Sequence, residues 1–391
     1  MSKLPAEVKL FGAVSLLNDF ASEMIYPLIP AFVTSVLGGG PVALGALDGF
    51  ADLTAAGLKF ASGRLADRPG RRGLLIVLGY FLAVVVRPFI AFTAAAWQVI
   101  GLRVVDRVGK GIRSAPRDAL IADVTPAELR GRAFGLQRGL DHAGAVLGPL
   151  TAWWLLATHR LVIRGVFAAS IVPGLVVLLL AVVAVRGKGD GRVEGGRLEG
   201  EPSLPTFQPS IAFLIPVSYL LRMPETLLIL RSQQLGVSVA SVLLLWAALH
   251  VVRSSSSFLG GAATDRLGPA RVMWAGWLVY ALLAFGMARA GTAAAAWGLF
   301  LALGLVNGLT ESPERALVAR LAGTHQGSGF GLYHGITGFA ALIGGVALGA
   351  MFQRYGARPA FLASAVGGLG LVVVWSLVMS SRRGASLEVG E

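Results

Sequence analysis

The sequence predicts an all-α integral membrane protein whose twelve transmembrane helices form two pseudo-symmetric six-helix bundles. Three observations predict this fold class. The composition is too apolar for a water-facing surface, apolar runs long enough to span a bilayer recur along the chain, and a polar motif that begins at residue 63 returns in a second copy that begins at residue 261.

The composition sets the solvent. The chain has 391 residues, of which 55% are hydrophobic and 14% charged, and its mean hydropathy is +0.71. Soluble domains carry roughly 25% charged residues, so most of this surface is expected to face lipid. The 52 glycines suit transmembrane helices, which pack closely through small residues.

Composition and missing motifs also exclude several functions. There is no cysteine, which excludes disulfides, thiolate metal sites and cysteine nucleophiles. The net charge of +13 is expected to lie in cytoplasmic loops rather than on a nucleic-acid-binding face. The sequence has no His-Glu-x-x-His, Gly-x-Ser-x-Gly or Walker string. We therefore expect no enzyme, no catalytic residue, no cofactor, no metal and no nucleic-acid partner.

A membrane-spanning helix needs about 20 mostly apolar residues. Twelve such stretches are predicted, at 8–36, 43–63, 73–92, 95–113, 133–157, 162–185, 210–231, 238–261, 271–289, 294–314, 328–352 and 358–380. Proline occurs within several of them, as at Pro149, Pro216 and Pro224, where neighbouring helices can satisfy the freed backbone groups.

A polar segment rich in glycine and charge divides the helices six from six. It predicts an N-terminal bundle at 1–185, a cytoplasmic linker at 186–209 and a C-terminal bundle at 210–391. Lysine and arginine concentrate in alternate connections and in this linker, which places both termini in the cytoplasm by the positive-inside rule. We expect a multi-pass protein of the cell (inner) membrane that works as a monomer.

Three segments repeat in order between the two halves. Gly63-x-x-x-Asp67-Arg68-x-Gly70-Arg71-Arg72 returns as Gly261-x-x-x-Asp265-Arg266-x-Gly268 without the basic pair. Residues 115–123 are echoed by 312–320, and 134–139 by 330–335. Because each half has an even number of helices, the copies share topology and are expected to be related by an axis along the membrane normal.

These residues resemble the major facilitator superfamily over nearly the whole chain. The motif at 63–72 looks like the family's loop motif between helices 2 and 3. Arg103-x-x-Asp106-Arg107-x-Gly109-x-Gly111 resembles its helix-4 motif, with Arg107 where glycine is usual. Gly144-x-x-x-Gly148-Pro149 resembles its helix-5 exporter motif, with Ala152 and Trp153 in place of the trailing glycine pair. The resemblance implies two bundles around a central cavity that opens alternately to either side, driven by an ion gradient.

Ionisable residues within apolar helices are costly and mark a cavity or a partner. Asp19 and Glu23 lie four apart in the first helix, on one face. Two neighbouring carboxylates suit proton binding and release; alternatively, both pair with arginine and hold the bundle together. Asp141 and His142 on the fifth helix are the second candidate proton site, because histidine titrates nearest neutral pH. The alternative there is an Arg138–Asp141 pair.

Three arginines are candidate cavity cations. Arg103 and Arg107 lie four apart on the fourth helix. Three roles are open to them: counter-charges for an anionic substrate, a switch that releases a carboxylate, or structural ion pairs. Arg222 near the middle of the seventh helix could form a cross-cavity latch to acids in the first half. Asp48 and Asp52 are expected in an external vestibule or at a water-facing helix end.

Further ionisable side chains lie on the eighth and tenth helices. His250 and Arg253 lie on the eighth helix, and we expect Glu311 on the tenth to form a structural pair with Arg315.

The loop motif predicts a cytoplasmic latch. Gly63 permits close packing, Asp67 faces a helix end, and Arg71 or Arg72 reaches a carboxylate at the end of the fourth helix, with Asp118 and Asp123 as candidates. The full set of predicted gating residues is Gly63, Asp67, Arg68, Gly70, Arg71, Arg72, Asp118, Asp123, Asp265 and Arg266.

The function predicted first is proton-coupled export of a small organic molecule. The alternatives are a proton- or ion-coupled symporter for a nutrient or organic anion, favoured by the three arginines, and a lipid flippase on the same scaffold. The expected partners are a small-molecule substrate, protons and the lipid bilayer.

Overall fold

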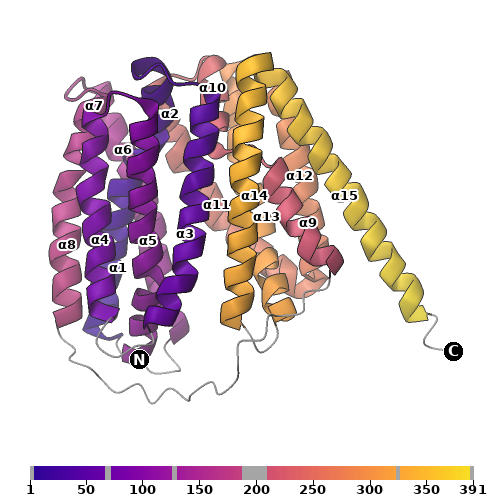
Figure 1. Ribbon diagram of the computed structural model, residues 1–391, viewed down its shortest axis with the longest axis horizontal. Helices are drawn as coiled ribbons and strands as arrows, with labels where there is room; N and C mark the ends of the chain where they lie inside the picture. Colours follow the sequence, from indigo (N-terminus) through magenta and orange to yellow (C-terminus); the bar gives the residue numbers. More distant parts are fainter. Residues whose placement is uncertain (1–3, 67–71, 126–129, 187–208, 323–325, 388–391) are drawn as a thin grey trace.

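The computed structural model describes residues 4–66, 72–125, 130–186, 209–322 and 326–387, and these are helical nearly throughout, with no strand among them. The helices run up and down between two common ends of the molecule (Figure 1). We call the basal end the one where the first helix begins at Ala6 and the sixth span ends at Arg186, and the apical end the opposite one.

The first six spans confirm the predicted stretches and in places lengthen them. They are α1 (Ala6–Glu23) continued by the short turns η1 (Tyr26–Leu28), α2 (Ile29–Ala31) and η2 (Phe32–Val36); α3 (Pro41–Ala66); α4 (Arg72–Phe89) with η3 (Ile90–Phe92); α5 (Ala96–Val124); α6 (Arg130–Ala157); and α7 (Ile163–Ala169) with α8 (Ile171–Arg186).

The second six spans follow the same pattern. They are α9 (Pro209–Leu221) with α10 (Glu225–Gln234), α11 (Val239–Leu267), α12 (Pro269–Arg289), α13 (Ala293–Ala322), α14 (Gln326–Tyr355) and α15 (Ala357–Leu387). Several helices outlast the apolar run that predicted them: α5 continues to Val124 rather than residue 113. Apolar length marks the bilayer core, whereas hydrogen bonding carries a helix beyond it.

The seventh span is broken, although the apolar run predicted one helix over 210–231. Leu221 ends α9 and Glu225 begins α10. Pro224 cannot donate to the helical ladder, and the freed groups find other partners. The Tyr280 hydroxyl accepts from Met223 N at 2.7 Å, and the Ser364 hydroxyl donates to Leu221 O at 2.7 Å. An irregular backbone at this depth is stable because other helices satisfy it.

Hydropathy alone identifies seven of the spans among the described residues as long and apolar enough to cross a membrane. The spans built from α1, α3, α5, α6 and α9–α10 fall short of that measure. They carry charged side chains such as Asp19, Asp48, Arg103 and Arg222, and those side chains line a cavity between the halves.

The apolar core shows how the halves meet. At the apical end one cluster joins both halves, with Leu28, Phe32 and Leu44 packed in the same core as Leu228 and Trp246. At the basal end the described residues form two separate cores. One contains Phe11 and Tyr80 of the first half, and the other contains Trp277 and Trp375 of the second. Among the described residues, the halves therefore share one apolar core apically and have separate cores basally.

The second copy of the polar motif turns the chain between α11 and α12. Gly268 alone separates the two helices, with φ of +82°, a conformation that favours glycine. Pro269 then begins α12, a position where its missing N–H is not needed. The chain therefore reverses its direction between α11 and α12 at a single residue, Gly268.

The tightest apical contact between the halves joins α3 and α14 (Figure 1). A Cβ built at Gly45 would overlap the carbonyl oxygen of Gly345, and one built at Gly345 would lie 2.7 Å from Gly45 O. Only glycine lets the two backbones approach this closely.

We expect Gly45→Val to open the apical end. Overpacking costs about 1–3 kcal/mol, and about 1.4 kcal/mol is tenfold in an equilibrium. A single cysteine at the buried position Leu228 should then react with a hydrophilic maleimide about tenfold faster. Gly57→Val on the same helix is the matched control, because a Cβ built at Gly57 has no neighbouring atom within 4 Å. Equal labelling rates in the two variants would contradict this role.

Candidate functional site

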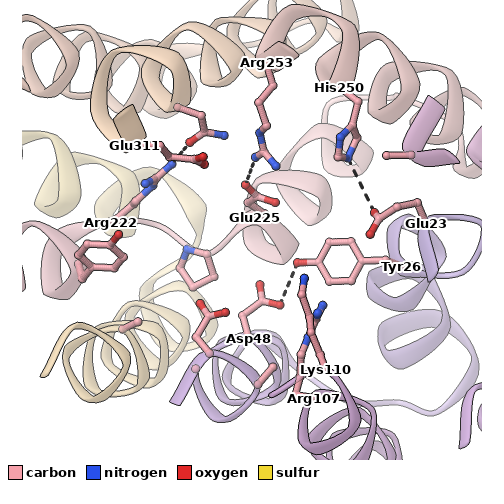
Figure 2. Close-up of a pocket in the computed structure, with 18 of the residues that line it drawn as sticks. Glu23, Tyr26, Asp48, Arg107, Lys110, Arg222, Glu225, His250, Arg253 and Glu311 are labelled. Atoms are coloured by element: carbon pink, nitrogen blue, oxygen red, sulfur yellow. Dashed lines mark hydrogen bonds and ion pairs between the residues drawn. The ribbon is translucent and has the colours of Figure 1, made fainter. Parts of the chain in front are cut away.

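A cavity of about 500 Å³ lies between the two halves (Figure 2). The first half contributes α1, α3, α5 and α6, and the second contributes the broken seventh span, α11, α13 and α14. The structure brings together in its wall all seven residues predicted for the cavity: Asp19, Glu23, Arg103, Arg107, Asp141, His142 and Arg222. Their individual roles stay predictions.

A buried ion cluster holds three helices of the first half together. Arg87 Nε on α4 lies 2.9 Å from Asp106 Oδ1, and Arg103 Nη1 lies 3.2 Å from Asp106 Oδ2, with all three side chains at most 4% exposed. Arg87 Nη1 also donates to the backbone and side-chain oxygens of Asn18 on α1, at 3.1 and 3.2 Å. Arg103 thus forms a structural ion pair with Asp106 on one side. On the other side its guanidinium carbon lies 4.7 Å from the centroid of the Tyr26 ring, a cation–π contact.

A chain of polar contacts continues from this cluster toward the basal end. Arg117 Nη1 donates to Ser15 Oγ at 3.3 Å, and Gln137 Nε2 donates to Ser15 Oγ at 3.0 Å and to Asp141 Oδ2 at 2.6 Å. Asp141 is therefore held on α6 by Gln137, one turn earlier. The Arg138 side chain of the alternative pairing lies outside the described residues.

Glu23 reaches across the cavity to the second half. Its Oε2 accepts from Trp246 Nε1 on α11 at 2.9 Å. The same oxygen lies 3.8 Å from His250 Nε2, also on α11 (Figure 2). Asp19, one turn earlier, accepts from Asn18 Nδ2 at 2.9 Å. Within the described ranges neither carboxylate forms an ion pair with arginine, so the arginine-pairing alternative has no support here.

Asp48 also joins the halves. Its Oδ1 accepts from the Tyr26 hydroxyl at 3.0 Å, and its Oδ2 accepts from Thr226 Oγ1 at 2.7 Å and from Thr226 N at 3.2 Å. Thr226 lies in the first turn of α10, so a carboxylate of the first half caps a helix N-terminus of the second, where negative charge is favoured. The expected vestibule or helix-end position of Asp48 and Asp52 is wrong, because both line the central cavity.

The break in the seventh span directs two charges into the cavity. Arg222 donates to Asn307 Oδ1 on α13, and Arg253 Nη2 lies 2.5 Å from Glu225 Oε1 at the start of α10. Both pairs stay within the second half (Figure 2). The predicted cross-cavity latch from Arg222 to acids of the first half is therefore absent among the described contacts, and Asp48 and Glu23 make the cross-cavity bonds instead.

Glu314 forms the acidic centre of a hydroxyl cluster. Tyr333 OH donates to its Oε1 at 2.7 Å, Tyr219 OH donates to its Oε2 at 3.4 Å, and the two hydroxyls lie 3.2 Å apart. Glu311, one turn earlier on α13, lines the cavity. The side chain of Arg315, its expected partner, lies outside the described residues.

Most of the predicted gating residues cannot be placed. Asp67, Arg68, Gly70 and Arg71, and the side chains of Asp123 and Asp265, lie outside the described residues, and Gly63 lies in the last turn of α3. Of the rest, Arg72 begins α4, Arg266 is exposed near the end of α11, and Asp118 Oδ1 lies 2.8 Å from Arg117 Nη2. The basal latch stays a prediction.

The cavity wall also contains ionisable residues that the sequence analysis did not assign to the cavity. Asp48, Glu225, His250, Arg253, Glu311 and Glu314 all line the cavity. The signal that selected Asp19, an ionisable residue inside an apolar helix, applies equally to them. No group of three or more His, Asp or Glu side chains in the described part of the chain could hold a metal ion.

Comparisons with known proteins agree with this fold. The family model of the Major Facilitator Superfamily matches residues 11–231 and again 210–390. An uncharacterised MFS-type transporter of Methanocaldococcus jannaschii is 28% identical over 350 residues, which is 87% of each chain. The multidrug resistance protein MdtH of Photorhabdus laumondii is 32% identical over 133 residues, 34% of this chain and 33% of that protein. The solved structure of the nucleoside transporter NupG covers 96% of this chain and 99% of its own, with 12% identity and a TM-score of 0.76, a likeness of fold alone.

Proposed function

The chain belongs to the Major Facilitator Superfamily and is a membrane transporter, and we propose that it exports a small organic molecule in exchange for protons. One observation carries the proton coupling. Glu23, a carboxylate inside the membrane, accepts a hydrogen bond from Trp246 and faces His250 across the boundary between the halves.

The division of the apolar core supports alternating access. One core joins the halves apically, while each half has its own core basally. The moving bodies are the bundles 1–185 and 210–391, linked by 186–209. With both termini and the linker in the cytoplasm of a cell (inner) membrane protein, the apical end is external and the cavity belongs to an inward-open state of a monomer.

Proton binding at Glu23 changes a contact that the transition must break. Hydrogen bonds to a charged group contribute about 1.5–3 kcal/mol each, and protonation of Glu23 removes the charge that attracts the Trp246 indole N–H. The proton thereby biases the equilibrium between two openings. Asp19 and His142 line the same cavity and can pass the proton between Glu23 and the basal side.

The direction of transport rests on two likenesses. A third of the chain resembles a multidrug resistance protein, and Gly144 and Gly148 occupy the glycine positions of the exporter motif. A Cβ at Gly144 would overlap Leu16 O on α1, and one at Gly148 would overlap Phe20 O. These glycines set the packing of α6 against α1, next to Asp19 and Glu23.

One alternative keeps the same machinery. A symporter for an organic anion is favoured by Arg103 and Arg107, which both face the cavity. A lipid flippase is less favoured, because charged side chains of both halves line the cavity and provide a poor surface for acyl chains.

A growth-inhibition screen of antibiotics and organic acids identifies a compound that the wild type extrudes. In proteoliposomes, the compound should then accumulate on the side of the membrane that has the higher proton concentration. Loss of the gradient should leave only exchange of labelled for unlabelled compound. Accumulation driven by a sodium gradient, or by no gradient, would contradict proton coupling.

Glu23→Gln should uncouple transport. We expect gradient-driven accumulation to fall about tenfold or more, within the usual range of coupling free energies, because the glutamine amide cannot bind a proton. Exchange at equal pH should persist, since the amide oxygen still accepts from Trp246. Asp19→Asn is the matched variant one turn earlier. If Asp19→Asn uncouples and Glu23→Gln does not, the proton site is Asp19; if neither does, the assignment to this pair fails.

A further inference from the structure

Two helices present opposite charges to each other across the cavity. On α5, Arg107 and Lys110 point into it, and on α13 Glu311 lies on the opposite side (Figure 2). Arg103, Arg107 and Lys110 share a face of α5 by their spacing of four and three, and Asn307, Glu311 and Glu314 share a face of α13 in the same way.

Most cavity charges are already matched by the protein itself. Arg103 is bound by Asp106, Arg253 by Glu225 and Arg222 by Asn307. Glu314 receives the hydroxyls of Tyr333 and Tyr219, and Glu23 the indole of Trp246. These side chains hold the structure of each half or the contact between halves.

Arg107 and Glu311 are different. Neither forms an ion pair or a side-chain hydrogen bond within the residues that the structure describes, and both are partly exposed to the cavity. Asn307, one turn from Glu311, is 1% exposed and its Nδ2 has no partner in that part of the chain. Within the described residues, a cation and an anion that lack ion-pair partners thus face one another across a space of about 500 Å³.

These two charges need partners when the cavity closes. In the open state water solvates them, whereas occlusion removes that water and leaves neither charge with a direct ion-pair partner among the described residues, which is unfavourable. A ligand that brings one negative and one positive group satisfies both at once. It also leaves the net charge of the cavity unchanged.

We infer that the substrate class is a small zwitterion, whose carboxylate or other anionic group binds Arg107 and whose ammonium group binds Glu311. This inference rests on the proposed transport function and adds the chemistry of its substrate. Lys110, one turn from Arg107, supports the anionic group. The volume is in the range of small-molecule sites, about 300–1,000 Å³.

A substrate with a single charge fits the lining less well. Eight carboxylates line the cavity against five Arg and Lys side chains; the acids are Asp19, Glu23, Asp48, Asp52, Asp141, Glu225, Glu311 and Glu314, and the bases are Arg103, Arg107, Lys110, Arg222 and Arg253. A bare anion therefore enters a site with an excess of negative charge. A bare cation leaves Arg107 unpaired on closure.

Matched ligands test this directly. The full-length chain in lipid nanodiscs is heated with γ-aminobutyrate, ε-aminocaproate and phenylalanine, which are zwitterions of different charge separation and bulk. Each is paired with its single-charge counterparts: butylamine and butyrate, hexylamine and hexanoate, phenylalanine amide and N-acetylphenylalanine. At least one zwitterion should raise the unfolding temperature at concentrations about tenfold below both of its counterparts, since each lost charged contact costs that much or more.

Charge reversal separates recognition from structure. Arg107→Glu and Glu311→Arg should each abolish stabilisation by the zwitterion, and the double variant should restore it with the ligand reversed. Arg107→Gln should lose the advantage of the zwitterion over the amine, and Glu311→Gln its advantage over the acid. Arg354→Gln, exposed at the end of α14, is the control. Absence of a zwitterion preference in the wild type, or no rescue by the double variant, overturns the inference.

Transport in proteoliposomes distinguishes this inference from the proposed function. If the bound zwitterion exchanges across the membrane but no proton gradient drives it, the proton-coupling proposal fails and the substrate class stands. If a proton gradient drives a singly charged compound and no zwitterion competes with it, the substrate class fails and the proposed function stands.

Discussion

Replacing Asp106 with Asn is expected to destabilise the first half of the protein by about 3–5 kcal/mol, the usual cost of removing one partner of a buried ion pair. Asp106 is the carboxylate that both Arg87 and Arg103 bind, with 4% of its side chain exposed. Its loss leaves two guanidinium groups inside the membrane without this counter-charge. It also removes the Arg87–Asp106 ion pair that joins α4 to α5. We expect the unfolding temperature of the purified protein to fall by roughly 5–15 °C.

Asp118→Asn is the matched control for this change. Asp118 also forms an arginine pair on α5, with Arg117, but 44% of its side chain is exposed. Exposed ion pairs contribute about 0–1 kcal/mol, so the unfolding temperature should change little. If Asp106→Asn unfolds at the same temperature as Asp118→Asn, the buried cluster does not support the fold as described.

Replacing Asp48 with Ala is expected to open the apical end. Asp48 accepts two hydrogen bonds from Thr226 and so attaches α3 of the first half to α10 of the second. Hydrogen bonds to a charged group contribute about 1.5–3 kcal/mol, so their loss shifts the equilibrium between the two openings about tenfold or more. Labelling of a single cysteine at Leu228 should accelerate by that factor.

Asp52→Ala controls for the loss of a cavity carboxylate. Asp52 lies one turn from Asp48 on α3 and lines the same cavity, and none of its described contacts is a hydrogen bond to the second half. Its removal should leave the labelling rate near that of the parent. Faster labelling in Asp52→Ala than in Asp48→Ala would mean that charge, and not the cap on α10, controls apical closure.

The number, order and spacing of the helices could be predicted because apolar length and the internal repeat are local properties of the sequence. The break at Arg222–Pro224 could not. Pro224 signalled a weak point, but whether the backbone bends or separates depends on Tyr280 and Ser364, which lie on helices distant in sequence. A run of apolar residues contains no information about those partners.

The sequence predicted several ionisable residues of the candidate cavity, but it did not predict the side-chain contacts that these residues make. The cost of an ionisable residue in lipid selected Asp19, Glu23 and Arg103, and the structure places these three in the cavity wall, where their roles stay predictions. The partner of Glu23 is Trp246, 223 residues later, and the partner of Asp106 is Arg87 on another helix. Pairings between helices depend on packing, which spacing along one helix does not reveal.

Alternating access is tested most directly by measuring distances across both ends of the same protein with pairs of spin labels. An apical pair can replace Arg160 and Arg354, and a basal pair Arg186 and Arg266, all four exposed. In lipid nanodiscs we expect a short apical and a long basal distance in the wild type. In Gly45→Val and Asp48→Ala the apical distance should lengthen while the basal distance shortens. Two distances that lengthen together, or that do not change in either variant, would contradict alternation between two openings.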